Sequence, residues 1–361
     1  MKPPPTRCLL QAMKTGLRRP GRRIEEGVSI VSSIMTNASA MTALQSLSAT
    51  NKALETTQNR ISTGYRVSEA KDNAAYWSIA TTMRSDNKAL SVVQDALGLG
   101  ASKVDTAYTA MNKVMERVDE IKVKLVAAVG SSADNKDKIQ SEIAALQIQL
   151  KSFADSASFS GTNWLSVAST VAAGNPAAGT HADAEIVSSF TRDASGNVVL
   201  SKIKINVQAI KLYDSAATTA ETRGITEGLR LATTGVREDT AVAGVAATVA
   251  ALDGYSVSTL TVVGFTDTQI TQMITVADQT LAEIADAATM LGAAKKQIDL
   301  QKEFTTSLMD SIERGVGQLV DADMNKESTR LQALQVQQQL GIQALSIANG
   351  NSQSILSLFR G

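Results

Sequence analysis

The chain has 361 residues, with 35 basic and 35 acidic side chains, 43% hydrophobic residues and only 4% aromatic ones. Its zero net charge gives no electrostatic reason to expect nucleic acid or an anionic membrane as a partner. A single cysteine and a single histidine leave almost no material for a disulfide, a metal site or histidine-based catalysis. We therefore expect no enzyme, no cofactor and no bound metal.

The first 30 residues differ from the rest of the chain. They hold four of the five prolines and the only cysteine, with seven basic side chains against two acidic ones. The apolar stretch of about 7–15 residues that a secretory signal needs is absent. One interpretation is a disordered basic arm. We favour another, a non-native leader translated from a start codon placed too far upstream, because codons for Glu25, Glu26 and Gly27 resemble a ribosome-binding site and the valine codon of Val31 can start translation.

The pattern after this leader predicts a helix with defined ends. Thr36, Asn37 and Ser39 are candidate N-caps, and the run Ser62-Thr63-Gly64 predicts the C-cap. Between them, apolar residues recur every seven positions, with one more among them: Ala40, Leu47, Leu54, Ile61 and Leu44.

The clearest pattern in the chain is an unbroken series of apolar heptads between residues 90 and 128. Its first positions are Leu90, Leu97, Val104, Met111, Val118 and Leu125. A repeat of seven kept over this length predicts a left-handed coiled-coil seam. Gly100 and Ala107 in the same series leave room for a close partner or a large opposing side chain. A shorter helix is predicted over about 135–155.

The character changes between about 156 and 265, where alanine, threonine, serine and glycine rise. Val198-Val199-Leu200, with alternating apolar residues after it, and a second run over 258–263 predict strands. Gly196-Asn197 is typical of the turn between strands. We expect a small central α/β or β-rich domain.

Seven-residue spacing returns after residue 267, in a series that includes Ile284, Leu291, Ile298 and Ile312. Gly315-Val316-Gly317 is expected to interrupt this helix. A final helix is predicted to about residue 358, with an apolar side formed by Leu331, Leu334, Ile342, Leu345, Ile355 and Phe359. The whole pattern predicts a mainly α fold, an antiparallel long-helix coiled-coil rod formed by both chain ends. The apolar stripes of the end helices are narrow, so they need a partner, and a second copy is the expected one.

Both ends of the chain resemble those of one family. The stretches are RISTGYRV at 60–67, AKDNAA at 70–75, NKESTRL at 325–331, QQLGIQALSIAN at 338–349 and ILSLFR at 355–360. They resemble bacterial flagellins, in particular the short type of alphaproteobacteria such as rhizobia and agrobacteria. The resemblance implies a structural subunit of the extracellular flagellar filament, exported unfolded by the flagellar type III apparatus for swimming motility. A hook–filament junction (hook-associated) protein is the alternative.

The resemblance also implies a division of the chain. Residues 31–75 and 320–361 would carry the inner-tube helices, 76–165 and 267–319 the two halves of the rod domain, and 166–266 a variable, surface-exposed domain. The implied partners are further copies in a helical homopolymer, with other flagellins among them, together with hook-associated and cap proteins and an export chaperone. No nucleic acid and no membrane are expected. An enzyme or binding module on a coiled coil is the alternative from a different class, and the zinc-protease motif H-E-x-x-H is absent.

The resemblance assigns roles to residue sets. Inner-tube packing falls to Leu44, Leu47, Leu54, Ile61, Leu331, Leu334, Ile342, Leu345, Ile355 and Phe359. The rod-domain seam comprises Leu90, Leu97, Val104, Met111, Val118, Leu125, Ile284, Leu291, Ile298 and Ile312. Segments that align with those detected by plant and animal receptors contain Arg60, Ser62, Gly64, Lys71, Asp72, Arg117 and Glu120. Departures from the common pattern, such as Tyr65 and the acidic Asp119, predict poor recognition by both receptors.

Overall fold

The computed structural model describes residues 37–169, 181–193, 195–216 and 222–358, without the side chains of 351–358. The leader predicted over 1–30, and Phe359, lie outside this part. The chain divides into two compact units. Unit 1 contains residues up to Gly64 together with those from Ala322 onward, and unit 2 contains Tyr65–Asp321.

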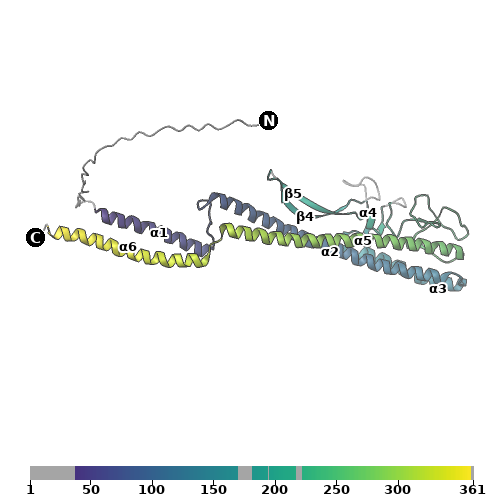
Figure 1. Cartoon of the computed structure of the whole chain (residues 1–361). Coiled ribbons are helices and arrows are strands. Elements are labelled where there is room, and N and C mark those ends of the chain that lie inside the picture. The colour runs from purple at the N-terminus through teal and green to yellow at the C-terminus, as the bar shows by residue number, and fades with distance from the viewer. Residues whose placement is uncertain (1–36, 170–180, 194, 217–221, 359–361) are drawn as a thin grey trace, which may run out of the picture. The chain divides into compact units, whose positions relative to one another are not determined.

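Unit 1 is a pair of helices, α1 (Ala38–Thr63) and α6 (Met324–Leu358), which lie side by side (Figure 1). The side chain of Asn37 caps α1 by accepting a hydrogen bond from the Ala40 N–H at 3.0 Å. Gly64 ends the helix at φ 75°, a left-handed conformation that glycine adopts without a steric cost, and its N–H donates to the Arg60 carbonyl. The predicted ends of this helix are therefore confirmed.

Unit 2 is built on α2 (Ala74–Ala128), α3 (Ala133–Ser156) and α5 (Asp267–Val320). α2 packs against both other helices (Figure 1). Asn73 caps α2, and Thr266 with Gln269 forms a capping box at the start of α5. The mainly α architecture with long paired helices is the fold class that the sequence predicts.

The heptad positions of α2 form the centre of the unit 2 core. Leu90, Leu97, Val104, Met111, Val118 and Leu125 are all buried, and so are Ile284, Leu291 and Ile298 on α5. Ile312 is only half-buried, because it lies beside a separate small cluster of Val67, Ala80, Val316 and Val320.

α5 continues through Gly315 and Gly317, so the predicted interruption there is wrong. A glycine inside a helix costs only about 1 kcal/mol relative to alanine. Burial of Val316 and Val320 in the small cluster offsets that cost. Val67 reaches the cluster because the N–H groups of Arg66 and Val67 both donate to the Val320 carbonyl at the end of the helix.

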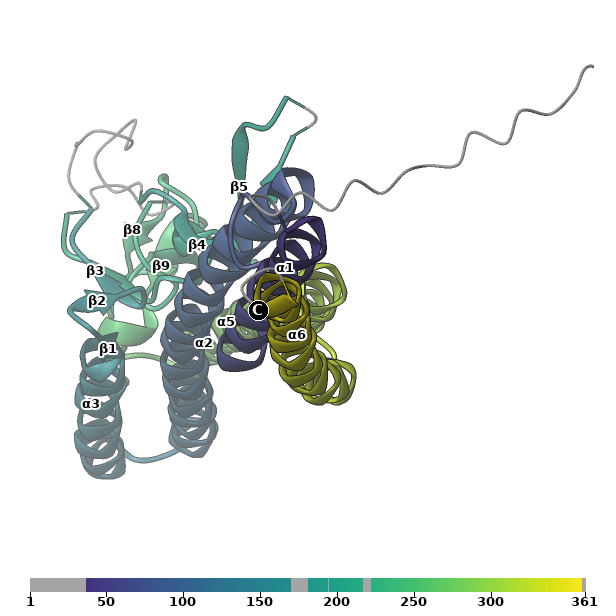
Figure 2. The ribbon, with the colours of Figure 1, turned by 90° about the vertical axis from the view of Figure 1, so that its left-hand side faces the viewer.

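The central segment carries short strands along one side of the unit 2 helices (Figures 1 and 2). The antiparallel pair β4 (Ala184–Arg192) and β5 (Val198–Ile205) packs on α2, with a register shift between Val187 and Ser189. The Cβ of a residue at position 100 would lie 2.5 Å from Ile186 Cγ2, so Gly100 is the close-approach position that its sequence context predicts.

The remaining strands are short. β1 (Ser158–Phe159) pairs antiparallel with β2 (Thr162–Asn163), and β3 (Ser166–Val167) pairs parallel with β6 (Tyr213–Asp214). A third group has the order β7 (Arg230–Leu231), β9 (Asp253–Tyr255), β8 (Val242–Ala243). The helix α4 (Val207–Ile210) lies between β5 and β6 in the chain order, and the 3₁₀ turn η1 (Val257–Thr259) follows β9.

The strand predicted over 258–263 is wrong, because this segment forms η1 and irregular backbone. Glutamine side chains of α3 take the place of a neighbouring strand. Gln147 Nε2 donates to the carbonyls of Val257 and Leu260, and the Val262 N–H donates to Gln140 Oε1 at 2.8 Å. Leu260 and Val262 of this segment are still buried, whereas Val263 is exposed.

Candidate assembly surfaces

The interface between α1 and α6 contains little apolar surface. The residues of this interface recur every seven positions along each helix. The leucines and the isoleucine among them are only half-buried: Leu47, Leu54, Ile61, Leu331, Leu334 and Leu345. The residues of the interface that are fully buried are Thr50, Thr57 and Glu327. We call this set of half-buried and buried positions the α1–α6 seam. Because its buried side chains are small or polar, the seam contributes little hydrophobic stabilisation.

Polar contacts join the two helices along the seam. Arg60 Nη1 donates to Glu327 Oε1 at 3.2 Å, and Gln338 Nε2 donates to Asn51 Oδ1 at 2.8 Å. Asn37 Nδ2 donates to the Ala348 carbonyl at 2.9 Å. Residue numbers fall along α1 as they rise along α6, so the helices run antiparallel in a single register.

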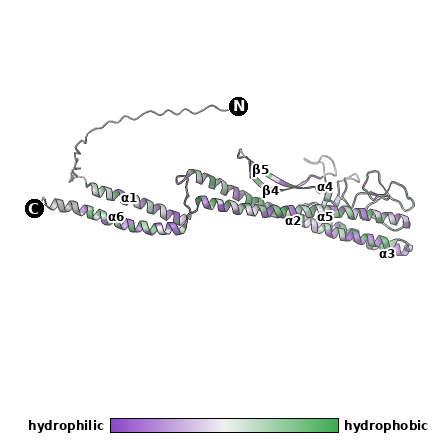
Figure 3. Ribbon diagram, viewed as in Figure 1, coloured by the Kyte–Doolittle hydropathy of each residue, from purple (hydrophilic) through white to green (hydrophobic). Residues whose placement is uncertain are grey.

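Large apolar side chains of unit 1 lie away from the seam and face water. We call them the outward apolar face: Met41, Leu44, Val336, Leu340, Ile342 and Ile347, each between 54% and 66% exposed. Figure 3 shows hydrophobic residues recurring along both helices. On α1, Met41 and Leu44 line a shallow groove of about 810 Å³ together with smaller neighbours. Several large apolar side chains exposed on one pair of helices indicate a site of interaction.

The residues predicted for inner-tube packing fall into two groups. Leu44 and Ile342 belong to the outward apolar face, whereas six others lie in the seam. Ile355 lies in α6, where its side chain is not described, and Phe359 lies outside the described residues. The seven-residue spacing of apolar residues marks only one side of each helix. It therefore did not indicate Met41, Val336, Leu340 and Ile347, which lie on other sides.

The residues predicted for receptor recognition have separate local settings. In unit 1, Arg60 is held by Glu327, Ser62 is exposed in the last turn of α1, and the Gly64 carbonyl accepts from the Ala322 N–H at 2.9 Å. In unit 2, Lys71 forms an exposed ion pair with Glu69. Asp72 accepts hydrogen bonds from the N–H groups of Glu69 and Ser68, which hold the pKa of its carboxyl below the ordinary value.

Arg117 and Glu120 pair with each other on α2 at 2.7 Å, and Glu116 lies 3.6 Å from the same guanidinium. The structure thus gathers the predicted receptor residues into no single polar site. Arg60, Lys71, Arg117 and Glu120 take part in ion pairs, Asp72 accepts backbone hydrogen bonds, and Ser62 is exposed.

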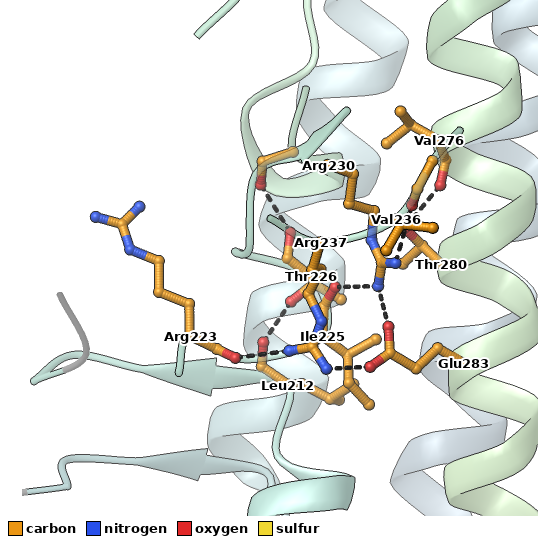
Figure 4. A network of polar contacts seen from close by, with 12 residues as sticks. Leu212, Arg223, Ile225, Thr226, Arg230, Val236, Arg237, Val276, Thr280 and Glu283 are labelled. Atoms are coloured by element: carbon orange, nitrogen blue, oxygen red, sulfur yellow. Dashed lines mark hydrogen bonds and ion pairs between the residues drawn. The ribbon is translucent and has the colours of Figure 1, made fainter. Parts of the chain in front are cut away.

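Unit 2 contains a polar network that no sequence pattern predicts. Arg230 and Arg237, on and near β7, both form ion pairs with Glu283 of α5 (Figure 4). Arg230 also donates to the carbonyls of Gly235 and Ile225, and Arg237 donates to that of Arg223. Burial lowers the pKa of the Arg230 guanidinium. The network fastens the central segment to α5.

A second buried ion pair joins Lys211 to Asp214 at 2.6 Å, with both side chains fully inaccessible to water. Asp214 Oδ1 also accepts hydrogen bonds from the N–H groups of Ser169 and Ala216, so β3 and β6 are held together around one carboxylate. Burial lowers the pKa of the Lys211 amine. Both ion-pair networks join segments of unit 2 that are distant in the chain.

Across the described ranges, no group of three or more histidine, cysteine or acidic side chains is placed to hold a metal ion. In the same part of the chain, no helix combines the length and the apolarity needed to cross a membrane.

Comparisons with known proteins match both ends of the chain. Residues 34–170 match the bacterial flagellin N-terminal helical region, and residues 274–359 match the bacterial flagellin C-terminal helical region. The chain is 49% identical over 331 residues to a flagellin of Brucella melitensis, covering 92% of this chain and all of that protein. It is 49% identical over 336 residues to flagellin C of Rhizobium meliloti and 43% identical over 404 residues to flagellin A of that organism, in each case covering 91% of this chain and the whole relative.

Proposed function

Since this chain belongs to the bacterial flagellin family, we propose that the outward apolar face of α1 and α6 is a surface through which it polymerises. The protein is a structural subunit of the extracellular flagellar filament, where it serves motility, and it is not an enzyme. Self-polymerisation follows from membership of the family. Nothing in the fold or the comparisons favours the hook-associated alternative.

The observation that carries the proposal is the distribution of apolar side chains in unit 1. The large apolar side chains of the outward apolar face are more than half exposed, while the buried positions between the helices are threonine and glutamate. Full burial of one large aliphatic side chain contributes about 1.5–3 kcal/mol. Because these side chains are 54–66% exposed, covering one contributes about 1–2 kcal/mol, and covering all of them contributes roughly 5–12 kcal/mol, comparable with the association cost of about 4–15 kcal/mol. Contacts between two different faces of identical subunits build an open helix when the rotation from one subunit to the next does not close a ring.

The proposal extends to the division of the chain. Residues 31–75 and 320–361 form the inner-tube part, 76–165 and 267–319 form the rod, and 166–266 forms the exposed outer surface. The paired α2 and α5, with their buried heptads, support the rod assignment. The short strands of the central segment support its assignment as a separate outer region.

Further partners belong to the same proposal. Other flagellins fit the outward apolar face when they share this pattern. Hook-associated and cap proteins would cover it at the two filament ends, and an export chaperone would cover α1 or α6 sequences before assembly. Exposed apolar side chains on a secreted monomer support the need for such a cover.

We also propose that plant and animal receptors recognise this chain poorly. Glu116 and Glu120 both pair with Arg117 on α2, the acidic Asp119 adds a negative charge to the same segment, and Val67 is buried within the other segment. Purified protein should give no strong activation of either receptor at low concentration. Strong activation would contradict this part of the proposal.

The assembly proposal is tested with the double variant Leu340→Ser/Ile347→Ser of the full chain, produced as the sole flagellin of a motile cell. The expected result is secreted protein that no longer sediments as filaments. The matched control is Val245→Ser/Val249→Ser, which removes the same kind of exposed side chain from the central segment. If Leu340→Ser/Ile347→Ser sedimented as filaments to the same extent as the control, that result would contradict the proposal.

A further inference from the structure

The α1–α6 seam holds a charged pair in a position where stability alone favours a leucine. Glu327 occupies the same seven-residue series as Leu334, and its side chain is only 9% exposed. One of its oxygens accepts from Arg60, while Oε2 is buried without a hydrogen-bond partner. A buried carboxylate with an unsatisfied oxygen costs stability.

The apolar residues of the seam do not determine how far α1 is shifted along α6. Leu47, Leu54 and Ile61 repeat every seven residues and are similar in size. A slide of one heptad therefore places a similar side chain at each apolar position. Small buried residues such as Thr50 and Thr57 give little resistance to such a slide.

The polar residues respond to the same slide in a different way. Arg60 faces Glu327 and Asn51 faces Gln338 in the observed register. Consider a slide of one heptad, in which each residue of α6 moves to a position seven residues earlier on α1. Glu327 then lies opposite Ala53, and Gln338 lies opposite Leu44. The carboxylate then loses its cation while it stays in the seam. Single polar residues at seam positions of coiled coils specify register in this manner, at a cost in stability.

We propose that Arg60 and Glu327, supported by Asn51 and Gln338, are positioning residues that fix the register of α1 on α6. This inference rests on the proposed function, because the register decides which parts of the outward apolar face lie side by side for a neighbouring copy. The ion pair acts on assembly through this geometry and needs no contact with the neighbour. Asn37 reinforces the register, because its side chain caps α1 and donates to the Ala348 carbonyl of α6.

The experiment uses charge exchange in the full chain, produced as the sole flagellin of a motile cell. The variants are Arg60→Glu, Glu327→Arg and the double exchange Arg60→Glu/Glu327→Arg. Sedimented filament is measured relative to total secreted protein. Each single variant is expected to lose about tenfold or more of its filament, because one buried charge then has no partner. The double exchange is expected to restore most of it. Lys326→Glu, an exposed charge reversal on the adjacent residue, is the matched control and is expected to leave assembly unchanged.

A second variant separates register from simple stability. Arg60→Leu/Glu327→Leu replaces the pair by apolar side chains, which keep or increase the stability of the helix pair. It is expected to assemble into filaments with more than one helical repeat, as seen by image analysis of single filaments. Filaments with one repeat, identical to the wild type, would overturn the inference.

Further outcomes distinguish a failure of the register inference from a failure of the proposed function. Single variants that assemble as well as the wild type, or a double exchange that stays unassembled while hydrogen exchange shows unit 2 intact, would overturn the register inference and leave the proposed function standing. Failure of the wild-type protein to sediment would instead contradict the proposed function.

Discussion

Replacement of Glu283 by glutamine is expected to release the central segment from α5 while the helical core of unit 2 stays folded. Glu283 is the carboxylate shared by Arg230 and Arg237. Glutamine keeps the size of the side chain but removes its charge, so both guanidinium groups lose their ion-pair partner. The carbonyls of Gly235 and Ile225 still accept from Arg230, but they carry no full negative charge.

The size of the effect follows from burial. The side chain of Arg230 is only 4% exposed, whereas that of Glu283 is 28% exposed and is partly screened by water. Removal of one partner from a buried ion pair typically costs about 3–5 kcal/mol. Because the glutamate is partly hydrated, we expect the lower end, about 3 kcal/mol of the free energy that holds residues 223–237 on α5.

Hydrogen exchange followed by mass spectrometry measures this free energy segment by segment. Peptides covering 223–237 should exchange about a hundredfold faster in Glu283→Gln, since about 1.4 kcal/mol corresponds to a factor of ten. Peptides from the middle of α2 should be unchanged. Glu303→Gln, at an exposed glutamate of the same helix, is the control. A change below about tenfold in 223–237 would refute the reasoning from buried charge.

Other substitutions test the packing and the ionisation of unit 2. Gly98→Ala has open space on α2 and should stabilise by about 1 kcal/mol in urea unfolding, whereas Gly100→Ala meets Ile186 and should give no such gain. Met111→Ala removes a fully buried side chain and should cost about 2–5 kcal/mol by the same measurement; a loss under about 1 kcal/mol would contradict its place in the core. Burial raises the pKa of the Tyr213 hydroxyl from 10.0 to about 12. The stability that the protonated Tyr213 side chain contributes is therefore fully present below pH 10.0 and is lost as the pH rises toward about 12. In unfolding curves measured at alkaline pH, the wild type should lose about 2–3 kcal/mol of its free energy of unfolding, and Tyr213→Phe should not show this loss. An equal loss in both proteins would refute the prediction.

Much of the helical structure follows from local sequence. Asn37 and Gly64 mark the ends of α1, because a side-chain acceptor and a residue free to adopt positive φ are needed there. The unbroken heptads of α2 predict a buried face, and every first position from Leu90 to Leu125 is buried. These features were predictable because helix caps and seven-residue periods act over one or two turns.

Other features depended on residues far apart in the sequence. The helix continues through Gly315 because Val67, from a distant segment, covers Val316 and Val320. Residues 258–263 lack a strand because α3 glutamines take up their backbone hydrogen bonds. Neither effect leaves a local pattern.

The long helices, their heptad core and, through the similarity of both chain ends to flagellins, the family were predictable from the amino-acid sequence. Periodicity and capping are properties of contiguous residues, so they could be read without a structure. The folded chain was needed to show which side of α1 and α6 faces inward, that Glu283 joins two arginines, and that Glu327 joins Arg60. These pairings depend on which surfaces meet when the chain folds, and the Arg60–Glu327 contact joins residues 267 positions apart. No local period specifies such a contact.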